Sequence, residues 1–317
     1  MRGRRHWSRA ALAAAALILL ILPVSAAAAP APSGPRLAVV KETWGPHRVK
    51  LLTVDPRGHA PARLAGGQES GGPVEAFGPL SWRPDGRVIA FNGLLTIFLA
   101  AAGGGTEEIN AAGAEWPVFA PDGHTVAFTR AEPQGESIWT IDLNTWEQRQ
   151  LTPWRRGLVY VATSFSPSGE TLLATRVIGD RKAEPVAIDL ATGKTRRLWS
   201  AGLHPIYSPD GSKVALLRKV GPRDLNDLFV LDLASRKLRR LTNTTPGYEL
   251  FPSWDPSGER IAFLRYRGRH FGMPNSVVQV NADGSCETVI FERRRRMSYG
   301  GPAWQPGPGR EAGRIRC

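Results

Sequence analysis

Cysteine is scarce in this sequence, which limits both cross-linking and metal binding. The 317 residues include only Cys286 and Cys317, so a dense disulfide scaffold and a metal site built on cysteine clusters are excluded. In an oxidising compartment, two cysteines in one chain favour a single bridge. A loose C-terminal tail would instead keep them apart, so the sequence leaves a Cys286–Cys317 disulfide open.

Signals of helices and of common catalytic sites are also missing. No stretch after the N-terminal region shows sustained helical periodicity with capping residues, which argues against a helical second domain. The absence of a Gly-x-Ser-x-Gly motif argues against a serine hydrolase. The histidines after this region also lack the spacing of a helical zinc motif; they are His47, His59, His124, His204 and His270. We therefore expect no metal, no cofactor and no catalytic group.

No apolar run is long enough for a membrane-spanning helix. The longest covers residues 10–24, whereas a spanning helix needs roughly 20 residues. Four arginines precede this run and the small residues 25–29 follow it, an order typical of a secretory signal peptide. We expect residues 1–29 to be cleaved after Ala27 or Ala29, with an uncleaved anchor as the alternative. The mature chain would then have no integral membrane segment and would lie in the periplasm, the cell envelope or the extracellular space.

The chain is basic. Removing the four arginines of the signal peptide from the formal charge of +13 leaves +9. Such a charge could attract a polyanion, although the strong preference for Arg over Lys also fits a bias in coding composition, and export argues against nucleic acid as the partner. One run could clamp an anionic polymer, or could lie in a solvated loop; it consists of Arg293, Arg294, Arg295 and Arg296.

One short phrase, an aromatic residue followed by x-Pro-Asp/Ser-Gly and an apolar strand, recurs along the chain. Its six copies are Trp82-Arg-Pro84-Asp85-Gly86, Phe119-Ala-Pro121-Asp122-Gly123, Phe165-Ser-Pro167-Ser168-Gly169, Tyr207-Ser-Pro209-Asp210-Gly211, Trp254-Asp-Pro256-Ser257-Gly258 and the truncated Trp304-Gln-Pro306-Gly307. The prolines are 37, 46, 42, 47 and 50 residues apart. A period of about 40 to 50 residues is typical of β-propeller blades.

The phrase has a mechanical interpretation. Proline ends a strand, and Asp or Ser followed by Gly favours a tight hairpin turn, so the phrase predicts the turn between the first two strands of a blade. Alternating apolar segments follow each turn and predict the remaining strands. The last copy stops after its first strand, while residues 36–66 supply three strands with no first strand before them. Pairing the two ends in one blade would close the ring.

These observations predict an all-β, six-bladed propeller with four-stranded antiparallel blades, in a single domain covering residues 30–317. The expected blades cover about residues 79–112, 117–152, 163–200, 205–243, 252–292, and 302–306 together with 36–66.

The phrase Pro-x-Trp-Ser-Pro-Asp-Gly-x-x-Ile-Ala-Phe is typical of TolB-like propeller repeats, which this sequence resembles over nearly all of its mature length. The resemblance implies the fold and leaves the function open, because one propeller hosts many activities. Two departures stand out. Only residues 30–35 separate the expected cleavage site from the first strand, so we expect no TolB N-terminal domain and no role in the Tol-Pal system. Prolyl-oligopeptidase-type enzymes also pair such a propeller with a hydrolase domain, for which this chain has no room.

Loops that lead into innermost strands ring one mouth of a propeller channel, and we expect a ligand there. The candidate residues form a mixed acidic and aromatic rim suited to a peptide or sugar; they are Glu115, Trp116, His204, Tyr248, Glu249 and Tyr299. Alternatively, the aromatic residues pack between blades and the carboxylates cap turns.

Two functions follow from these patterns. The first is a non-catalytic, exported, monomeric scaffold that binds a protein segment, peptide or glycan at the channel mouth. The second is a carbohydrate-active lyase or hydrolase, which would require Glu115 and Glu249 at a defined separation near His204.

Overall fold

The computed structural model describes residues 34–43, 48–69, 78–93, 96–102, 104–109, 111–133, 135–179, 182–220, 226–244, 247–267, 276–292, 297–309 and 312–317. The predicted signal peptide and the run Arg293, Arg294, Arg295 and Arg296 lie outside these residues. Within them the chain forms β-strands and turns, and no helix with the length and hydropathy of a membrane span is found there.

The strands pair mainly with their neighbours in sequence. One sheet has the order β24 (Met297–Trp304), β1 (Leu37–Thr43), β2 (Arg48–Val54), β3 (Ala62–Glu69). A second has the order β4 (Ser81–Trp82), β5 (Val88–Gly93), β6 (Thr96–Ala101), β7 (Thr106–Ile109). A third has the order β16 (Leu203–Tyr207), β17 (Lys213–Lys219), β18 (Asn226–Asp232), β19 (Leu238–Arg240). A fourth has the order β20 (Gly247–Trp254), β21 (Arg260–Arg267), β22 (Ser276–Asn281), β23 (Thr288–Phe291).

An eight-stranded sheet contains the remaining strands. Its first half is β8 (Ala114–Phe119), β9 (Thr125–Glu132), β10 (Gly135–Asp142) and β11 (Gln148–Gln150). Its second half is β12 (Leu158–Phe165), β13 (Thr171–Ile178), β14 (Lys182–Asp189) and β15 (Thr195–Arg197). The halves meet at one parallel pair, Glu136 with Val159.

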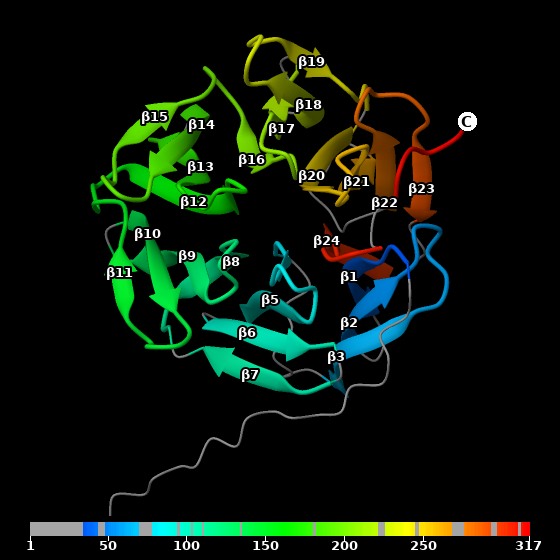
Figure 1. Ribbon diagram of the computed structural model, residues 1–317, viewed down its shortest axis with the longest axis horizontal. Helices are drawn as coiled ribbons and strands as arrows, with labels where there is room; N and C mark the ends of the chain where they lie inside the picture. The colour runs from blue at the N-terminus through cyan, green and yellow to red at the C-terminus, as the bar shows by residue number, and fades with distance from the viewer. Residues whose placement is uncertain are drawn as a thin grey trace, which may run out of the picture.

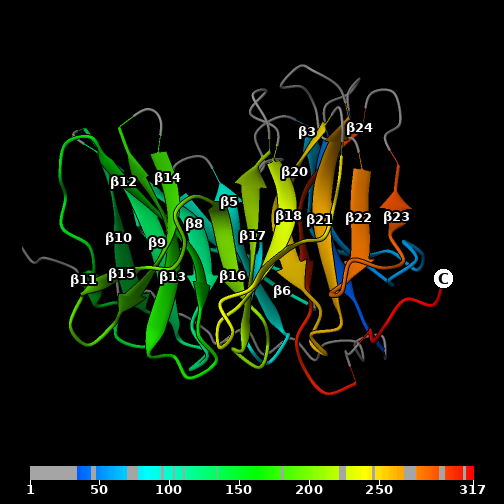
Figure 2. The same cartoon turned by 90° about the horizontal axis from the view of Figure 1, so that it is seen from above.

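The sheets stand around a common centre, so the prediction of an all-β propeller with four-stranded antiparallel elements is confirmed (Figures 1 and 2). The strands β8, β12, β16, β20 and β24 lie nearest the centre, and β3, β7, β11, β15, β19 and β23 lie at the rim. The predicted count of six separate sheets is corrected by the observed pairing. Four sheets of four strands stand alone, and the pair Glu136–Val159 fuses the other eight strands into one sheet.

Hydrophobic clusters fill the spaces between successive four-stranded units of the ring. One cluster packs Ile138 of β10 against Leu172 of β13, across the two halves of the eight-stranded sheet. The aromatic residue of each motif packs in one of these clusters, between its own unit and a neighbouring unit. Trp82 packs with Ala38 of the preceding unit, and Trp254 packs with Leu228 in the same way. The motif therefore specifies contacts between units as well as the local turn.

The motif forms the predicted turn between the first two strands of a unit. In the first copy the Arg83 N–H donates to the Val88 carbonyl, and the Gly86 N–H donates to the Arg83 carbonyl. Gly86 has a φ of 68°, in the region that favours glycine. The Asp85 carboxylate accepts the Arg87 N–H at 2.9 Å. The side-chain acceptor and the permissive glycine thus have the roles expected from the sequence.

The N- and C-terminal parts of the propeller close the ring in one sheet, as predicted. Strand β1 pairs antiparallel with β24, and Leu37 lies opposite Trp304. The innermost strand of this sheet thus comes from one end of the propeller sequence and its three neighbours from the other, and β24 covers the edge of β1 that would otherwise be unpaired.

The C-terminal residues continue from β24 back to the neighbouring β20–β23 sheet. Cys317 is bonded to Cys286, with the two Cα atoms 5.2 Å apart. The backbone of Ile315 exchanges hydrogen bonds with the side chain of Asn281 at 2.7 and 3.0 Å. This segment adds a second link between the closing sheet and its neighbour.

Candidate functional site

The innermost strands contain bulges where an aromatic residue precedes a proline. The register of β8 shifts between Glu115 and Val118, where Trp116 and Pro117 lie. Equivalent shifts enclose His204-Pro205 in β16 and Phe251-Pro252 in β20. Proline has no N–H to donate to the ladder, so it fits a bulge better than a regular position. These strands consequently begin a few residues before the expected blade limits.

The three residues before these prolines share a left-handed backbone conformation. The φ angles are 58° for Trp116, 46° for His204 and 51° for Phe251. Such values cost energy for residues with a Cβ atom and mark positions that the surrounding structure holds in place. The bulge therefore turns each of these side chains away from the ordinary alternation of the strand.

Side chains of the preceding unit hold several bulges in position. Asn92 Oδ1 accepts the Trp116 N–H at 2.9 Å, and Thr175 Oγ1 accepts the His204 N–H at 2.9 Å. At the equivalent place in β12, Thr129 Oγ1 accepts the Ala162 N–H at 3.1 Å. Each bond crosses from the second strand of one unit to the first strand of the next. The bulged N–H groups are thereby satisfied and the inner strands are fixed to one another.

The three aromatic side chains meet although they come from different parts of the ring. The Trp116 and His204 ring centroids are 5.3 Å apart, those of Trp116 and Phe251 are 5.8 Å apart, and those of His204 and Phe251 are 5.3 Å apart. Distances in this range are favourable for aromatic pairs. We call Trp116, His204 and Phe251 the aromatic triad.

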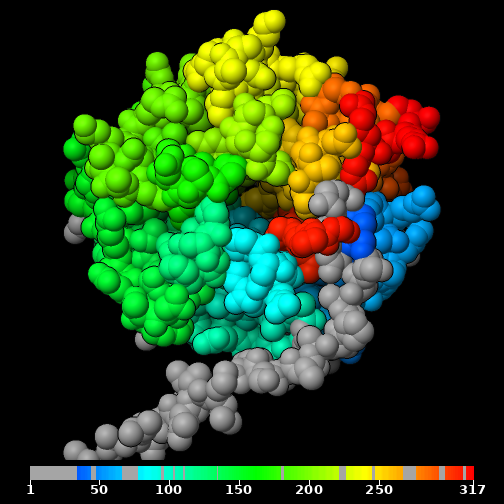
Figure 3. Space-filling view, viewed as in Figure 1, coloured from blue at the N-terminus to red at the C-terminus, as the bar shows by residue number. Residues whose placement is uncertain are grey.

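A cavity of about 530 Å³ lies among the inner strands and includes the aromatic triad in its lining. Figure 3 shows a hollow near the middle of the corresponding face. The prolines of all six motif copies also line it: Pro84, Pro121, Pro167, Pro209, Pro256 and Pro306. Hydroxyl groups such as those of Ser164 and Tyr207 add polar atoms, while no Asp, Glu, Lys or Arg is among the described lining residues. The cavity is therefore concave, mainly apolar and uncharged.

The cavity and the expected site lie toward different ends of the inner strands. It extends from the aromatic triad toward the Pro-Asp-Gly turns, at the ends of these strands. The prediction placed the ligand at the opposite mouth, where chains enter the strands.

His204 is neutral in this setting. Desolvation by the surrounding protein lowers its pKa to about 4. Its imidazole ring therefore has one N–H donor and one nitrogen acceptor above about pH 5. His204 is the one titratable side chain of the aromatic triad. Because its ring is uncharged near neutral pH, it adds no charge to the apolar cavity.

Two of the tyrosines predicted for the rim pack between strands instead. Tyr248 is buried and stacks on Tyr266, with ring centroids 4.4 Å apart. Tyr299 is buried and stacks on Phe291 at 5.2 Å. Glu115 is partly buried in β8 next to Trp116 and raises the pKa of Glu136, together with the larger effect of desolvation. None of these three residues lines the cavity.

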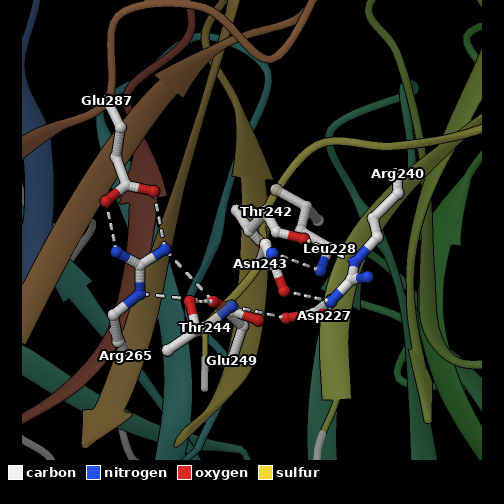
Figure 4. Close-up of polar contacts among 9 residues, drawn as sticks. All are labelled: Asp227, Leu228, Arg240, Thr242, Asn243, Thr244, Glu249, Arg265 and Glu287. Atoms are coloured by element: carbon white, nitrogen blue, oxygen red, sulfur yellow. Dashed lines mark hydrogen bonds and ion pairs between the residues drawn. The ribbon is translucent and has the colours of Figure 1, made fainter. Parts of the chain in front are cut away.

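Glu249 belongs to a buried polar network between two units (Figure 4). Its Oε1 accepts the Thr244 hydroxyl at 2.5 Å and the Arg265 Nη2–H at 3.1 Å. Arg265 also donates to Glu287, at 2.7 Å for the Nη2–Oε2 pair. The Thr244 N–H donates to Asp227 at 3.0 Å, so the network runs from the β20–β23 sheet into the β16–β19 sheet.

The network contains three carboxylates and two guanidinium groups. Asp227 pairs with Arg240, while Arg265 pairs with both Glu287 and Glu249, so Glu249 shares its cation with a second carboxylate. Burial raises the pKa of Glu249 to about 7, although Thr244 and Arg265 oppose that rise. Its Oε2 atom is buried with no hydrogen-bond partner in the described structure. If Glu249 is protonated, the network contains two negative charges, on Asp227 and Glu287, and two positive charges, on Arg240 and Arg265, and is neutral overall.

The structure thus brings together Trp116 and His204 of the six predicted residues, and it places Glu249 elsewhere. Phe251 and the lining prolines were not selected from the sequence. Their signal was available, since Trp116, His204 and Phe251 each lie three residues before the motif aromatic and directly before proline. In the part of the chain that the structure describes, no group of three or more His, Cys, Asp or Glu side chains could hold a metal ion.

Comparisons with known proteins support the fold. No family model matches the sequence. A protein TolB homolog of Chlorobium chlorochromatii is 27% identical over 147 residues, which cover 46% of this chain and 32% of that protein; the match thus spans about a third of the relative's length. The crystal structure of TolB from Acinetobacter baumannii has a TM-score of 0.69 and 22% identity over 86% of this chain and 67% of its own.

A second solved structure, described as a TolB candidate from Agrobacterium tumefaciens, has a TM-score of 0.64 and 17% identity. The similarity covers 86% of this chain and 99% of that one. The described part of this chain is therefore similar to TolB in fold, and its propeller is TolB-like.

Proposed function

We propose that this protein is a non-catalytic, exported scaffold that binds an apolar segment of another protein in its central cavity. The observation that carries the proposal is the cavity itself, whose described lining combines aromatic rings, prolines and hydroxyls without a charged side chain. Concave apolar sites with a few polar groups are the usual form of ligand sites. Trp116, His204 and Phe251 are the residues of the site.

The cavity suits one or a few residues of an inserted segment better than a large rigid partner. About 530 Å³ is within the range of pockets for small ligands. Tryptophan, phenylalanine and proline present rigid apolar surface and lose little conformational entropy on binding. The ring nitrogens of His204 could hydrogen-bond the backbone of the segment.

The proposal includes a six-bladed ring, in which the eight-stranded sheet acts as two blades. In support, the two halves of that sheet share a hydrophobic cluster with each other, and only one pair of residues joins them in the ladder. It also includes export to the cell envelope or beyond, supported by the basic and apolar N-terminal sequence of residues 1–29. The domain limits of 30–317 belong to the same proposal.

The alternative, a carbohydrate-active lyase or hydrolase, lacks a comparable observation. It would need carboxylates beside a substrate site. Glu249 instead bonds Thr244 and Arg265 between two sheets, and Glu115 is not among the residues that line the cavity. A glycan remains a second ligand class for the same cavity, because aromatic rings and hydroxyls also suit sugars.

Selection of random peptides on the purified protein tests the proposal. Selected peptides should bind the Trp116→Ala and Phe251→Ala variants at least about tenfold more weakly, since each variant removes a large aromatic contact. Trp146→Ala is the matched control, because Trp146 also has a left-handed backbone, with a φ of 62°, but is 43% exposed on a turn outside the cavity.

Equal binding by the wild type and both cavity variants would place the ligand elsewhere and refute the proposal. Selection of glycans but no peptides, with the same loss in the two variants, would retain the cavity and replace the protein segment by a sugar.

A further inference from the structure

The outermost strands of the ring differ in charge at equivalent positions. In β11 Arg149 lies opposite Thr140, in β15 Arg196 lies opposite Ala187, and in β19 Arg239 lies opposite Val230. These are the same register positions of three consecutive units. Arg197 and Arg240 follow in two of these strands. We call Arg149, Arg196, Arg197, Arg239 and Arg240 the basic belt; all five are exposed.

The other outermost strands carry less positive charge. In β3 one arginine, Arg63, lies opposite Leu52, which is the position that Arg197 and Arg240 occupy in their own units. The corresponding positions of β7 are Glu107 and Glu108, opposite Leu99 and Phe98. In β23 they are uncharged, with Thr288 opposite Gln279 and Val289 opposite Val278. A bias in composition alone would spread arginine over all six outermost strands. Five arginines instead lie on three neighbouring strands, against one in β3 and none in β7 or β23, and the adjacent strand β7 has the opposite sign.

Two guanidinium groups of the basic belt are free to meet a ligand in the described structure, and the other three keep unused N–H donors beside their partners. Within the described part of the chain, the guanidinium groups of Arg149 and Arg196 make no ion pair or hydrogen bond. Arg197 has only a distant partner, 3.8 Å from Glu184, Arg239 donates one hydrogen bond to the Ala282 carbonyl at 2.7 Å, and Arg240 is paired with Asp227. The adjoining turns add further exposed cations, Lys194, Arg236 and Lys237. Positive charge therefore predominates along this part of the rim.

The shape of the rim distinguishes two kinds of anionic partner. Strands β11, β15 and β19 stand at successive places around the outside of the ring (Figure 1). A flat bilayer touches a convex rim mainly at one unit, so it could not engage all three strands together. A flexible polymer can follow the curve and meet each strand in turn.

We propose that the basic belt binds a flexible, linear polyanion with phosphate or carboxylate groups along the outer edge of β11, β15 and β19. Arginine suits such a ligand because its planar guanidinium can donate two parallel hydrogen bonds to a phosphate or carboxylate. The site is separate from the central cavity and shares no residue with it.

Binding of long-chain inorganic polyphosphate to the purified protein tests this inference. The belt variant combines Arg149→Gln, Arg196→Gln and Arg239→Gln. The control variant combines Arg57→Gln, Arg63→Gln and Arg87→Gln, which removes the same charge from exposed positions elsewhere on the ring. The belt variant should bind at least about tenfold more weakly at low salt and show a shallower dependence of affinity on salt, because three phosphate contacts are lost. The control should lose clearly less.

Three results would overturn the proposal: equal losses in both variants, no loss in either, or binding to phosphatidylglycerol vesicles without binding to polyphosphate. Thermal unfolding of both variants shows that the fold is retained. Trp116→Ala should leave polyphosphate binding unchanged, so failure of the cavity proposal and failure of the belt proposal can be told apart.

Discussion

Replacing Glu249 by glutamine should change the pH dependence of stability in a defined direction. The pKa of Glu249 is about 7 in the folded protein, against an ordinary value of 4.5. The folded state therefore holds a proton that the unfolded state has released between these two values. Stability from this group is fully present below about pH 4.5 and is lost as the pH rises to about 7. The gap in pKa corresponds to about 3 kcal/mol.

Glutamine keeps the shape of a protonated glutamate and cannot ionise. It can still accept the hydrogen bonds from Thr244 and Arg265 that Glu249 Oε1 accepts. The Glu249→Gln variant should thus resemble the wild type near pH 4.5 and exceed its free energy of unfolding by up to about 3 kcal/mol at pH 8. The difference between the two proteins isolates the contribution of Glu249, because their other ionisable residues are the same.

Urea unfolding, followed by tryptophan fluorescence between pH 4.5 and 8, measures this difference. Glu287→Gln is the control, because Glu287 pairs with the same Arg265 but its side chain is 37% exposed; this variant should gain no stability at pH 8. If Glu249 is instead ionised and held by Arg265, Glu249→Gln should lose about 3 to 5 kcal/mol at pH 8. A loss of that sign, or a difference that does not vary with pH, refutes the reasoning.

Three further predictions concern other parts of the ring. Replacing Cys286 and Cys317 by serine should lower the free energy of unfolding by about 3 to 4 kcal/mol, given the separation of 31 residues between the two cysteines. Unfolding with and without reductant measures this loss, and two free thiols in non-reducing mass spectrometry would contradict the disulfide. Gly86→Ala should destabilise the protein by about 2 kcal/mol more than Gly104→Ala. Both glycines have positive φ, but of the two only Gly86 is so placed that a Cβ would collide with the Pro306 carbonyl. Equal melting temperatures of the two variants would be inconsistent with this close approach. The imidazole of His204 should show no NMR titration between pH 5.5 and 8, since its pKa is about 4, and a midpoint near 6.5 would mean that its ring is well hydrated.

The repeated motif predicted much of the fold because the same turn sequence recurs in each unit, so each copy supports the interpretation of the others. Pro84, Asp85 and Gly86 form the expected turn, and the missing first strand predicted the pairing of β1 with β24. The fusion of two units through Glu136 and Val159 was not predictable. It depends on how closely two neighbouring units approach, and neither residue has a distinctive pattern.

The candidate site was harder to predict because a strand position alone does not fix the direction of a side chain. Trp116 and His204 reach the cavity because bulges give them positive φ angles. Glu249 is two residues before Phe251, and the sequence offers no sign that it turns toward Arg265 instead. The partners of buried charges come from distant strands, so they follow from the assembled ring and not from local pattern.

The joining of β1 to β24 makes the most C-terminal strand of the described propeller a structural requirement for its most N-terminal strand. A chain that ended before Met297 would leave the backbone groups of β1 without their partner strand. That open row could accept a strand from another molecule. Incomplete chains should therefore associate or be degraded, and a selectable marker fused after Cys317 would report only on molecules that contain the closing strand.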